Sequence, residues 1–328
     1  MDMNPDLTHS AFLFPGQGSQ KPGMGRELAA RYEPARLTFG QADEVLGFSL
    51  SSLMWEGPED ALNDTLNTQP ALYVHSVAAQ RVLENLLPGH KPVLCAGHSL
   101  GELSALTVAG ALPFEAGLRL VQRRGELMKR AGVITPGGMA AILGLDIPAL
   151  ETVCAQASNA NEVVQVANDN CPGQVVISGA RPALERALEL AKAAGARRAL
   201  PLAVSIAAHS PLMASIQADW DTAVAEAPFT NGAMPVVGNV HAQAMTRADE
   251  FRLDLSAQLT CRVRWIETIQ FMRARGVNTF LELGSGDVLT GLLKRIDQET
   301  SGWALGTPED FKKWLSPFIH GLGTSPAG

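Results

Sequence analysis

Short apolar runs alternate along this chain with longer stretches in which apolar residues recur at helical spacing. Residues 11–14 and 92–96 are apolar runs of the kind that buried strands show. Residues 67–87 and 114–131 carry the helical spacing. Strands that alternate with helices are typical of a mostly parallel sheet, because each strand needs a crossover to reach the next. The pattern therefore predicts an α/β core.

The order of elements changes in the middle of the chain. The expected strands there are residues 139–145, 163–167, 174–178 and 196–204, and the expected helices are residues 148–157 and 181–195. The order strand-helix-strand-strand-helix-strand is that of a ferredoxin-like unit. The sequence therefore predicts a ferredoxin-like subdomain of residues 136–204, inserted into a larger domain made of residues 1–135 and 205–328.

Composition and charge narrow the class of protein. The chain has 328 residues, 46% of them hydrophobic and 18% charged, which is enough to bury the cores of two domains. The net charge is −7, and Lys and Arg are scattered, so no nucleic-acid partner is expected. No stretch approaches the apolar length of a membrane span, and residues 1–6 carry acids where a signal peptide needs basic residues. We therefore expect a soluble cytoplasmic protein that binds no membrane.

The cysteines do not form a recognisable site. Cys95, Cys154, Cys171 and Cys261 are far apart in the sequence, and none has a second cysteine or a histidine at metal-ligand spacing. We expect four free thiols and no metal.

A candidate nucleophile follows the second apolar run. Residues 97–101 read Gly-His-Ser-Leu-Gly, and a helix-forming stretch comes next. A Gly-x-Ser-x-Gly run between a strand and a helix is typical of a nucleophile elbow, where the serine takes a strained backbone and the glycines let neighbouring chain approach. Ser99 is therefore the candidate nucleophile. The alternative is that Ser99 only caps the following helix.

An arginine on the apolar face of a helix is the second unusual residue. The stripe that faces inward over residues 114–131 has Arg124 at its centre, whereas the other basic residues of this stretch fall outside it. A buried guanidinium needs an anionic partner. That partner is either an acid of the same chain, in a salt bridge, or a substrate carboxylate, which arginine binds with two parallel hydrogen bonds.

A nucleophilic serine also needs a base. Among the seven histidines, His209 is best placed, because it follows a strand pattern over residues 200–206 and precedes Ser210-Pro211, which resembles a helix start. Active-site residues of α/β proteins gather on such loops at strand ends. His209 is therefore the candidate base, with a purely structural capping role as the alternative.

Dispersed motifs in a fixed order resemble those of one family. The residues are 14–20 (Phe-Pro-Gly-Gln-Gly-Ser-Gln), 68–71 (Thr-Gln-Pro-Ala), 97–102 (Gly-His-Ser-Leu-Gly-Glu), Arg124-Gly125, 170–176 (Asn-Cys-Pro-Gly-Gln-Val-Val) and 289–292 (Leu-Thr-Gly-Leu). Together they resemble the malonyl-CoA:acyl carrier protein transacylase family over residues 11 to about 296. The closest similarity is to free-standing fatty-acid transacylases and to trans-acting acyltransferases of polyketide synthases. The resemblance implies an α/β-hydrolase-like catalytic domain with a ferredoxin-like insertion.

The resemblance implies a role for individual positions. Ser99 matches the acylated serine and His209 the general base, while Arg124 matches the clamp on the malonyl carboxylate. The remaining matches are Gln17 and Leu100 for the oxyanion-hole amides, Asn170 for a pocket residue, and Gln258 for the backbone carbonyl that orients the histidine. Read without the resemblance, Asn170 is a turn former and Gln258 an exposed helix residue.

The implied activity is a two-step acyl transfer. A malonyl group moves from malonyl-CoA to a serine ester, and then to the phosphopantetheine thiol of an acyl carrier protein for fatty acid or polyketide synthesis. We expect a monomer that needs no cofactor besides these substrates. Residues 206–209, Ile-Ala-Ala-His, depart from the His-Ala-Phe-His pattern of many malonyl-specific polyketide acyltransferases. Ala208 leaves more room than phenylalanine, so we expect some tolerance for α-substituted malonyl units. The alternatives are an acyl carrier protein hydrolase and a malonyl-loading subunit of a malonate decarboxylase.

Overall fold

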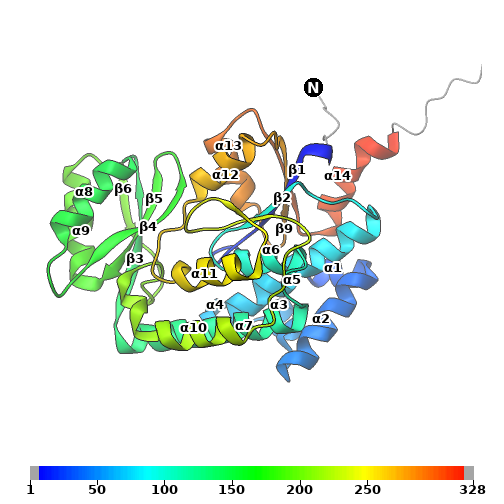
Figure 1. The fold of residues 1–328 in the computed structure, drawn as a ribbon, viewed down its shortest axis with the longest axis horizontal. Helices are drawn as coiled ribbons and strands as arrows, with labels where there is room; N and C mark the ends of the chain where they lie inside the picture. The colour runs from blue at the N-terminus through cyan, green and yellow to red at the C-terminus, as the bar shows by residue number, and fades with distance from the viewer. Residues whose placement is uncertain (1–6, 321–328) are drawn as a thin grey trace, which may run out of the picture.

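The chain folds around two β-sheets (Figure 1). The structure, a computed structural model, describes residues 7–320 and the side chains up to residue 317; the expectation about a signal peptide in residues 1–6 falls outside it. The larger sheet has the strand order β10-β9-β1-β2-β7-β8, and all its neighbours are parallel except β7 and β8. Its strands are β1 (Ser10–Phe14), β2 (Leu94–Gly97), β7 (Val236–Val237), β8 (Ala244–Met245), β9 (Thr279–Leu283) and β10 (Ser301–Leu305).

Strand β1 shows why its sequence is a continuous apolar run. All of its residues are buried, and their side chains alternate between the two faces of the sheet. Phe12 and Phe14 belong to the largest hydrophobic cluster, whereas Ala11 and Leu13 belong to a second cluster on the opposite face. A parallel strand covered by helices on both faces has no solvent side that would select polar residues.

Helices cover both faces of the larger sheet. The second cluster contains side chains of α12 (Trp265–Arg273) and α13 (Val288–Ile296). The largest cluster draws on the other helices of this unit, which are α1 (Arg26–Arg31), α2 (Glu33–Leu46), α3 (Leu50–Glu56), α4 (Glu59–Asn63), α5 (Thr65–Leu86), α6 (Gly101–Val108), α7 (Phe114–Ile134), α10 (Gln217–Glu226), α11 (Ala248–Gln258) and α14 (Pro308–His320). Two short 3-10 helices, η1 (Leu7–His9) and η2 (Pro211–Ile216), complete the part of the chain that the structure describes. This arrangement confirms the predicted α/β core.

The smaller sheet is antiparallel, with the order β4-β5-β3-β6. Its strands are β3 (Gly137–Leu143), β4 (Val164–Cys171), β5 (Gln174–Ala180) and β6 (Arg198–Pro201), and its helices are α8 (Ile147–Ala157) and α9 (Arg181–Ala193). A third hydrophobic cluster lies between this sheet and its two helices. The predicted order of strands and helices is therefore confirmed, while the exact ends of the subdomain stay a prediction.

All four predicted strands of this unit differ in extent from the observed ones. Strands β4 and β5 end at Cys171 and Ala180, beyond the expected ends at residues 167 and 178. The first strand is residues 137–143 rather than 139–145, because Gly144 has a φ of 95° and turns the chain. The last strand, β6, covers only Arg198–Pro201 of the expected 196–204. It is an edge strand with mostly exposed residues, so burial does not extend its pairing beyond four residues.

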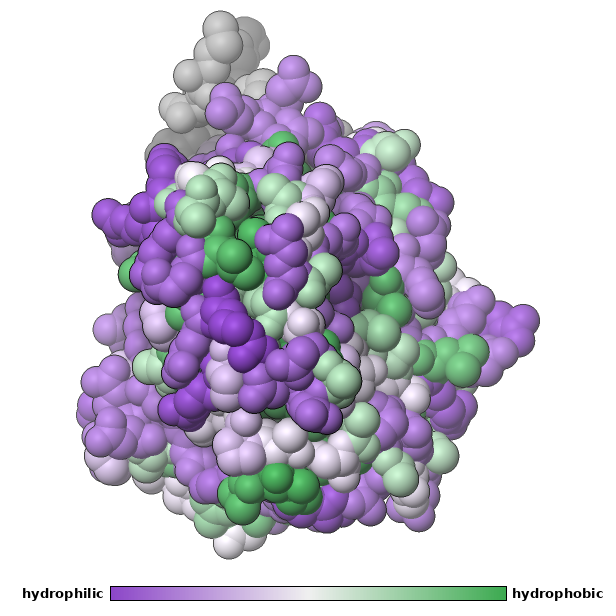
Figure 2. All heavy atoms as spheres, turned by 90° about the vertical axis from the view of Figure 1, so that its left-hand side faces the viewer, coloured by the Kyte–Doolittle hydropathy of each residue, from purple (hydrophilic) through white to green (hydrophobic). Residues whose placement is uncertain are grey.

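The surface that carries α8 and α9 is mostly hydrophilic, and its apolar side chains form small separate patches (Figure 2). Within residues 7–320 no helix is both long and apolar enough to cross a membrane.

Candidate active site

Ser99 stands on a strained turn between β2 and α6. Its φ is 51°, in the left-handed region that non-glycine residues rarely adopt. A Cβ on Gly97 would lie 1.9 Å from the Gly101 carbonyl oxygen, and one on Gly101 would lie 2.1 Å from that of Phe14. Both glycines are therefore required by close backbone contacts. The Ser99 side chain does not cap α6, because its Oγ contacts His209 and Arg124 instead.

His209 lies within hydrogen-bonding distance of Ser99. Its Nδ1–H donates to the backbone carbonyl of Gln258 at 2.8 Å, which leaves Nε2 to accept from Ser99 Oγ at 2.8 Å. Burial, followed by the nearby charge of Arg124, lowers the pKa of His209 to about 3. The imidazole is therefore neutral at neutral pH and able to take a proton. The capping role belongs to Ser210, whose hydroxyl accepts from the Leu212 amide.

The small sheet supports the histidine from the other side. Gln165 on β4 donates from its Nε2 to the backbone oxygen of His209 at 2.8 Å and to that of Thr260 at 2.9 Å. His209 itself has a φ of 58°, so this loop is also held in the left-handed region. The hydrogen bond from Gln165 connects the smaller sheet to the loop that carries His209, the residue that contacts Ser99.

Arg124 lies on the inward face of α7 and is 2% exposed. Its Nη1 donates to Gln69 Oε1 at 2.9 Å, and its Nη2 donates to Gln258 Oε1 at 2.9 Å and to Ser99 Oγ at 3.2 Å. Burial lowers the pKa of Arg124 to about 10, which leaves the guanidinium charged at neutral pH. The helical stripe in the sequence located this residue, and the structure places it against the candidate nucleophile.

Of the two partners expected for Arg124, an acid of the same chain is not found: in the part of the chain that the structure describes, Arg124 forms no ion pair. The other, a substrate carboxylate, stays a prediction. Two carboxamide oxygens, from Gln69 and Gln258, take the place of a carboxylate and satisfy donors of the guanidinium without neutralising it. Its Nε, which is buried, has no hydrogen-bond partner in the described part of the chain. The positive charge is therefore available to an anion from outside the protein.

The turn after β1 lies against the turn that carries Ser99. A Cβ on Gly16 would meet the backbone oxygen of His98 at 2.4 Å, so this close approach requires glycine. Within residues 7–320 neither the Gln17 N–H nor the Leu100 N–H donates a hydrogen bond to a protein acceptor. Two unpaired backbone donors on adjacent turns fit the expected oxyanion hole.

The other two expected site residues are also placed near this centre. Asn170 belongs to β4 rather than to a turn, and its Oδ1 accepts from His98 Nε2 at 2.8 Å. The ring of His98 is directed to Asn170 and packs edge-on against Trp265. Gln258 is 1% exposed at the end of α11, so it is not an exposed helix residue. Ala208 is half-buried next to His209.

Sequence reasoning missed a buried polar residue that fixes the turn. Asn239 accepts from the Ser99 amide at 2.7 Å through Oδ1, and donates through Nδ2 to the Gly97 carbonyl at 2.8 Å. Its own amide donates to Asp254 Oδ2 at 3.1 Å and, at 3.4 Å, to Glu102 Oε2. Gln69 and Glu102 lie inside motifs that carry the family resemblance, which was the available signal, whereas nothing local marks Asn239 or Asp254.

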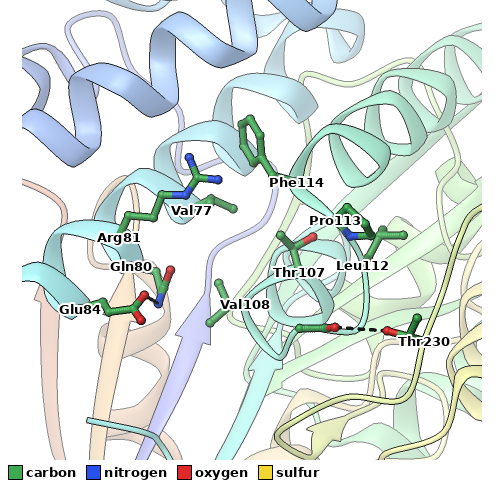
Figure 3. Close-up of a pocket in the computed structure, with 11 residues that line it drawn as sticks. Val77, Gln80, Arg81, Glu84, Thr107, Val108, Leu112, Pro113, Phe114 and Thr230 are labelled. Atoms are coloured by element: carbon green, nitrogen blue, oxygen red, sulfur yellow. Dashed lines mark hydrogen bonds between the residues drawn. The ribbon is translucent and has the colours of Figure 1, made fainter. Parts of the chain in front are cut away.

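A separate surface pocket lies outside the predicted site. Its volume is about 400 Å³, and Figure 3 shows Arg81, Phe114 and Thr107 among its lining residues. The Arg81 guanidinium lies 4.7 Å from the centre of the Phe114 ring and donates to Thr38 and Gln41. None of the residues expected at the active site lines this pocket.

In the described part of the chain no group of three or more His, Cys, Asp or Glu could hold a metal ion, and all four cysteines are free.

Comparison of the sequence with known families identifies the class of protein. The sequence profile of the acyl transferase domain matches residues 11–295. This chain therefore belongs to the acyl transferase domain family.

Particular relatives within this family cover nearly the whole chain. The malonyl CoA-acyl carrier protein transacylase of Escherichia coli (strain K12) is 44% identical over 302 residues, which are 92% of this chain and 97% of that protein. The structure of an acyl carrier protein S-malonyltransferase from Vibrio cholerae O1 biovar eltor str. N16961 is 43% identical, with a TM-score of 0.89 over 93% of this chain and 99% of that chain. The structure of a type II PKS acyl-carrier protein in complex with its malonyl-transacylase contains a chain that is 42% identical to this one. Its TM-score is 0.90, over 94% of this chain and 99% of that chain.

Proposed function

We propose that this chain transfers a malonyl group from malonyl-CoA to the phosphopantetheine thiol of an acyl carrier protein through an ester on Ser99. One observation carries the proposal: Ser99 Oγ lies within hydrogen-bonding distance of both a neutral imidazole, His209, and a charged guanidinium, Arg124. The first contact suits a nucleophile and its base. The second suits an acyl group that ends in a carboxylate.

In the first half-reaction, His209 Nε2 takes the proton of Ser99 and the oxygen attacks the thioester carbonyl. The negative charge on the carbonyl oxygen would be stabilised by the N–H groups of Gln17 and Leu100, and the loss of one such donor typically lowers the rate about 100- to 1,000-fold. The C–S bond then breaks, and the CoA thiolate leaves with the proton held by His209. A malonyl-serine ester remains.

The position of Arg124 supports selection of a dicarboxylate. Burial excludes water from the guanidinium, and its unpartnered Nε is a free donor for an incoming carboxylate. A hydrogen bond to a charged group contributes about 1.5 to 3 kcal/mol, enough to favour malonyl over acetyl by about ten- to a hundredfold. We propose Asn170 as a pocket residue on the small sheet, because it contacts the histidine that precedes Ser99.

In the second half-reaction the thiol of the carrier protein gives its proton to His209 and attacks the ester, and Ser99 regains a proton. No cofactor beyond the two substrates takes part in these steps. The relatives named above support a carrier protein of fatty acid or type II polyketide synthesis as the partner. Because CoA thioesters are intracellular metabolites, we expect the reaction in the cytoplasm. We also propose that the half-buried Ala208 leaves room for a substituent on the malonyl group.

Intact mass spectrometry tests this function directly. The purified protein and Ser99→Ala are exposed briefly to malonyl-CoA or acetyl-CoA, and then to a holo acyl carrier protein. We expect a malonyl adduct that depends on Ser99 and then moves to the carrier. Free CoA without an adduct would indicate a hydrolase, and an adduct that moves only to a dedicated decarboxylase carrier would indicate the malonyl-loading subunit. No release of CoA by the wild-type protein would refute acyl transfer.

A further inference from the structure

Two buried carboxyl groups meet behind the turn that carries Ser99. Glu102 on α6 is 0% exposed and Asp254 on α11 is 4% exposed. One oxygen of each, Glu102 Oε2 and Asp254 Oδ2, accepts from the Asn239 amide. The other oxygens, Glu102 Oε1 and Asp254 Oδ1, are buried and have no hydrogen-bond donor within the described residues.

Two ionised carboxylates in contact inside a protein are strongly unfavourable, because their charges repel and water does not solvate them. Burial, and next the proximity of Asp254, raises the pKa of Glu102 well above its usual range, and burial also raises the pKa of Asp254. The other groups that act electrostatically on the pair are the Arg124 guanidinium from α7 and the His241 side chain from the β7–β8 connection. The two side chains lie within hydrogen-bonding range of each other, so one proton shared between them removes the repulsion and supplies a donor that the unpaired carboxyl oxygens otherwise lack.

The pair contacts the two residues that hold the reacting groups. Glu102 Oε2 accepts from Gln258 Nε2 at 2.7 Å, which turns the Gln258 oxygen toward Arg124 Nη2 at 2.9 Å. The same Nε2 donates to the Ser99 carbonyl at 3.0 Å. Glu102 therefore determines which end of the Gln258 amide faces Arg124. Through Asn239, the pair also fixes the Ser99 backbone.

We propose that Glu102 and Asp254 share one proton and act as a positioning pair, which fixes Gln258 and Asn239 and, through them, the Arg124 guanidinium and the Ser99 turn. The proposal rests on the proposed function, since it names the residues that hold Arg124 ready for a carboxylate. Neither member of the pair touches substrate.

Matched variants of Glu102 test the proposal. Glu102→Gln keeps an oxygen for Gln258 and supplies an N–H to Asp254, so it reproduces the protonated acid. Glu102→Leu has a similar volume but removes the shorter of the two contacts of Gln258 Nε2, so that only the Ser99 carbonyl remains as its acceptor. We expect Glu102→Gln to acylate from malonyl-CoA within about threefold of wild type, and Glu102→Leu to lose about ten- to a hundredfold. We also expect the malonyl preference over acetyl to fall about tenfold in Glu102→Leu alone.

The ratio of the acylation rates with malonyl-CoA and acetyl-CoA distinguishes a positioning role from an effect on folding stability. A variant that only lowers the folded fraction reduces both acylation rates by the same factor. The control is Glu282→Gln, which changes another buried carboxyl, one that accepts from the Leu289 and Thr290 amides at the start of α13. It is expected to lower stability and leave the ratio unchanged. Equal losses in Glu102→Gln and Glu102→Leu, or an unchanged ratio in both, would overturn the proposal.

Infrared difference spectroscopy provides a readout that is independent of activity. At neutral pH, wild type minus Glu102→Gln is expected to show the carbonyl band of a protonated carboxyl group. Asp254→Asn is expected to remove the same band, because its N–H replaces the shared proton. Absence of the band refutes proton sharing even if Glu102→Leu does not fold. If wild type shows the band but acylates nothing, the proposed function fails while the shared proton stands.

Discussion

Arg124→Met is the substitution that separates binding of a carboxylate from the acyl transfer itself. Methionine has a similar length and no charge, so it fills much of the volume of a side chain that is 2% exposed. It removes the donors to Gln69, Gln258 and Ser99. Arg124→Lys is the matched partner, because it keeps the charge but loses the planar fork.

The contacts set the size of the effect. The loss of a charge-assisted bond to the malonyl carboxylate is expected to raise the barrier by about 1.5 to 3 kcal/mol, or about ten- to a hundredfold in rate. Acetyl-CoA has no carboxylate there, so its rate changes only through the lost contact with Ser99 Oγ at 3.2 Å. The two amide oxygens left without donors are expected to lower the free energy of unfolding by roughly 1 to 3 kcal/mol each.

The assay is the initial rate of ester formation with each CoA thioester, below the temperature at which the variants unfold. We expect the malonyl-to-acetyl ratio to fall about ten- to a hundredfold in Arg124→Met and by less in Arg124→Lys. Circular dichroism on the same samples reports the folded fraction. If Arg124→Met lowers both rates by one common factor, Arg124 does not bind the carboxylate and the assigned specificity is wrong.

Other predictions concern the turn and the histidine. Gly101→Ala places a Cβ 2.1 Å from the Phe14 oxygen and is expected to lower the free energy of unfolding in urea by about 1 to 3 kcal/mol. The control Gly291→Ala, in open space on α13, is expected to raise it by about 0.5 to 1 kcal/mol. Similar urea midpoints for the two variants would contradict the close contact at Gly101. Asn239→Ala removes the acceptor of the Ser99 amide and is expected to slow ester formation about tenfold in stopped-flow mixing. An unchanged rate would show that the Ser99 turn keeps its conformation without Asn239. Because the pKa of His209 falls from 6.5 to about 3 on folding, the unfolded chain binds the extra proton as pH drops below about 6.5, and about 2 kcal/mol of stability is lost by pH 5. His209→Gln is expected to flatten this acid slope in denaturant titrations, and an equal slope would exclude a neutral buried imidazole.

The sequence predicted those parts of the site whose signal is local. In a Gly-x-Ser-x-Gly run the glycines are needed because the backbone packs closely on both sides of a strained serine. The structure has these close contacts at Gly97 and Gly101. Arg124 could be located because helical periodicity states which side chains face inward. The ends of all four strands of the smaller sheet were misplaced. At β3 and β6 the reason is that a turning glycine and an exposed edge do not alter the apolar pattern.

The contacts between distant segments could not be predicted in the same way. Periodicity shows that Arg124 is buried but does not show what it meets, and the partners are the amides Gln69 and Gln258 rather than an acid. Asn239 and Asp254 look like ordinary polar residues in sequence, since their role arises only where α11 and the end of β7 come together behind the serine turn.

The strand order of the larger sheet has a consequence for the way this protein is made. Strand β1 is synthesised long before its neighbour β9, which begins at Thr279. All four strands of the smaller sheet lie within residues 137–201. During synthesis on the ribosome the smaller sheet can therefore form early. Until β9 is made, β1 keeps an unpaired edge that can form non-native hydrogen bonds with another strand. The nascent chain also has no complete candidate active site until the carbonyl of Gln258, which accepts from His209 Nδ1, has left the exit tunnel. An incomplete copy therefore has an exposed strand edge that favours aggregation, while its His209 ring lacks the carbonyl that orients it.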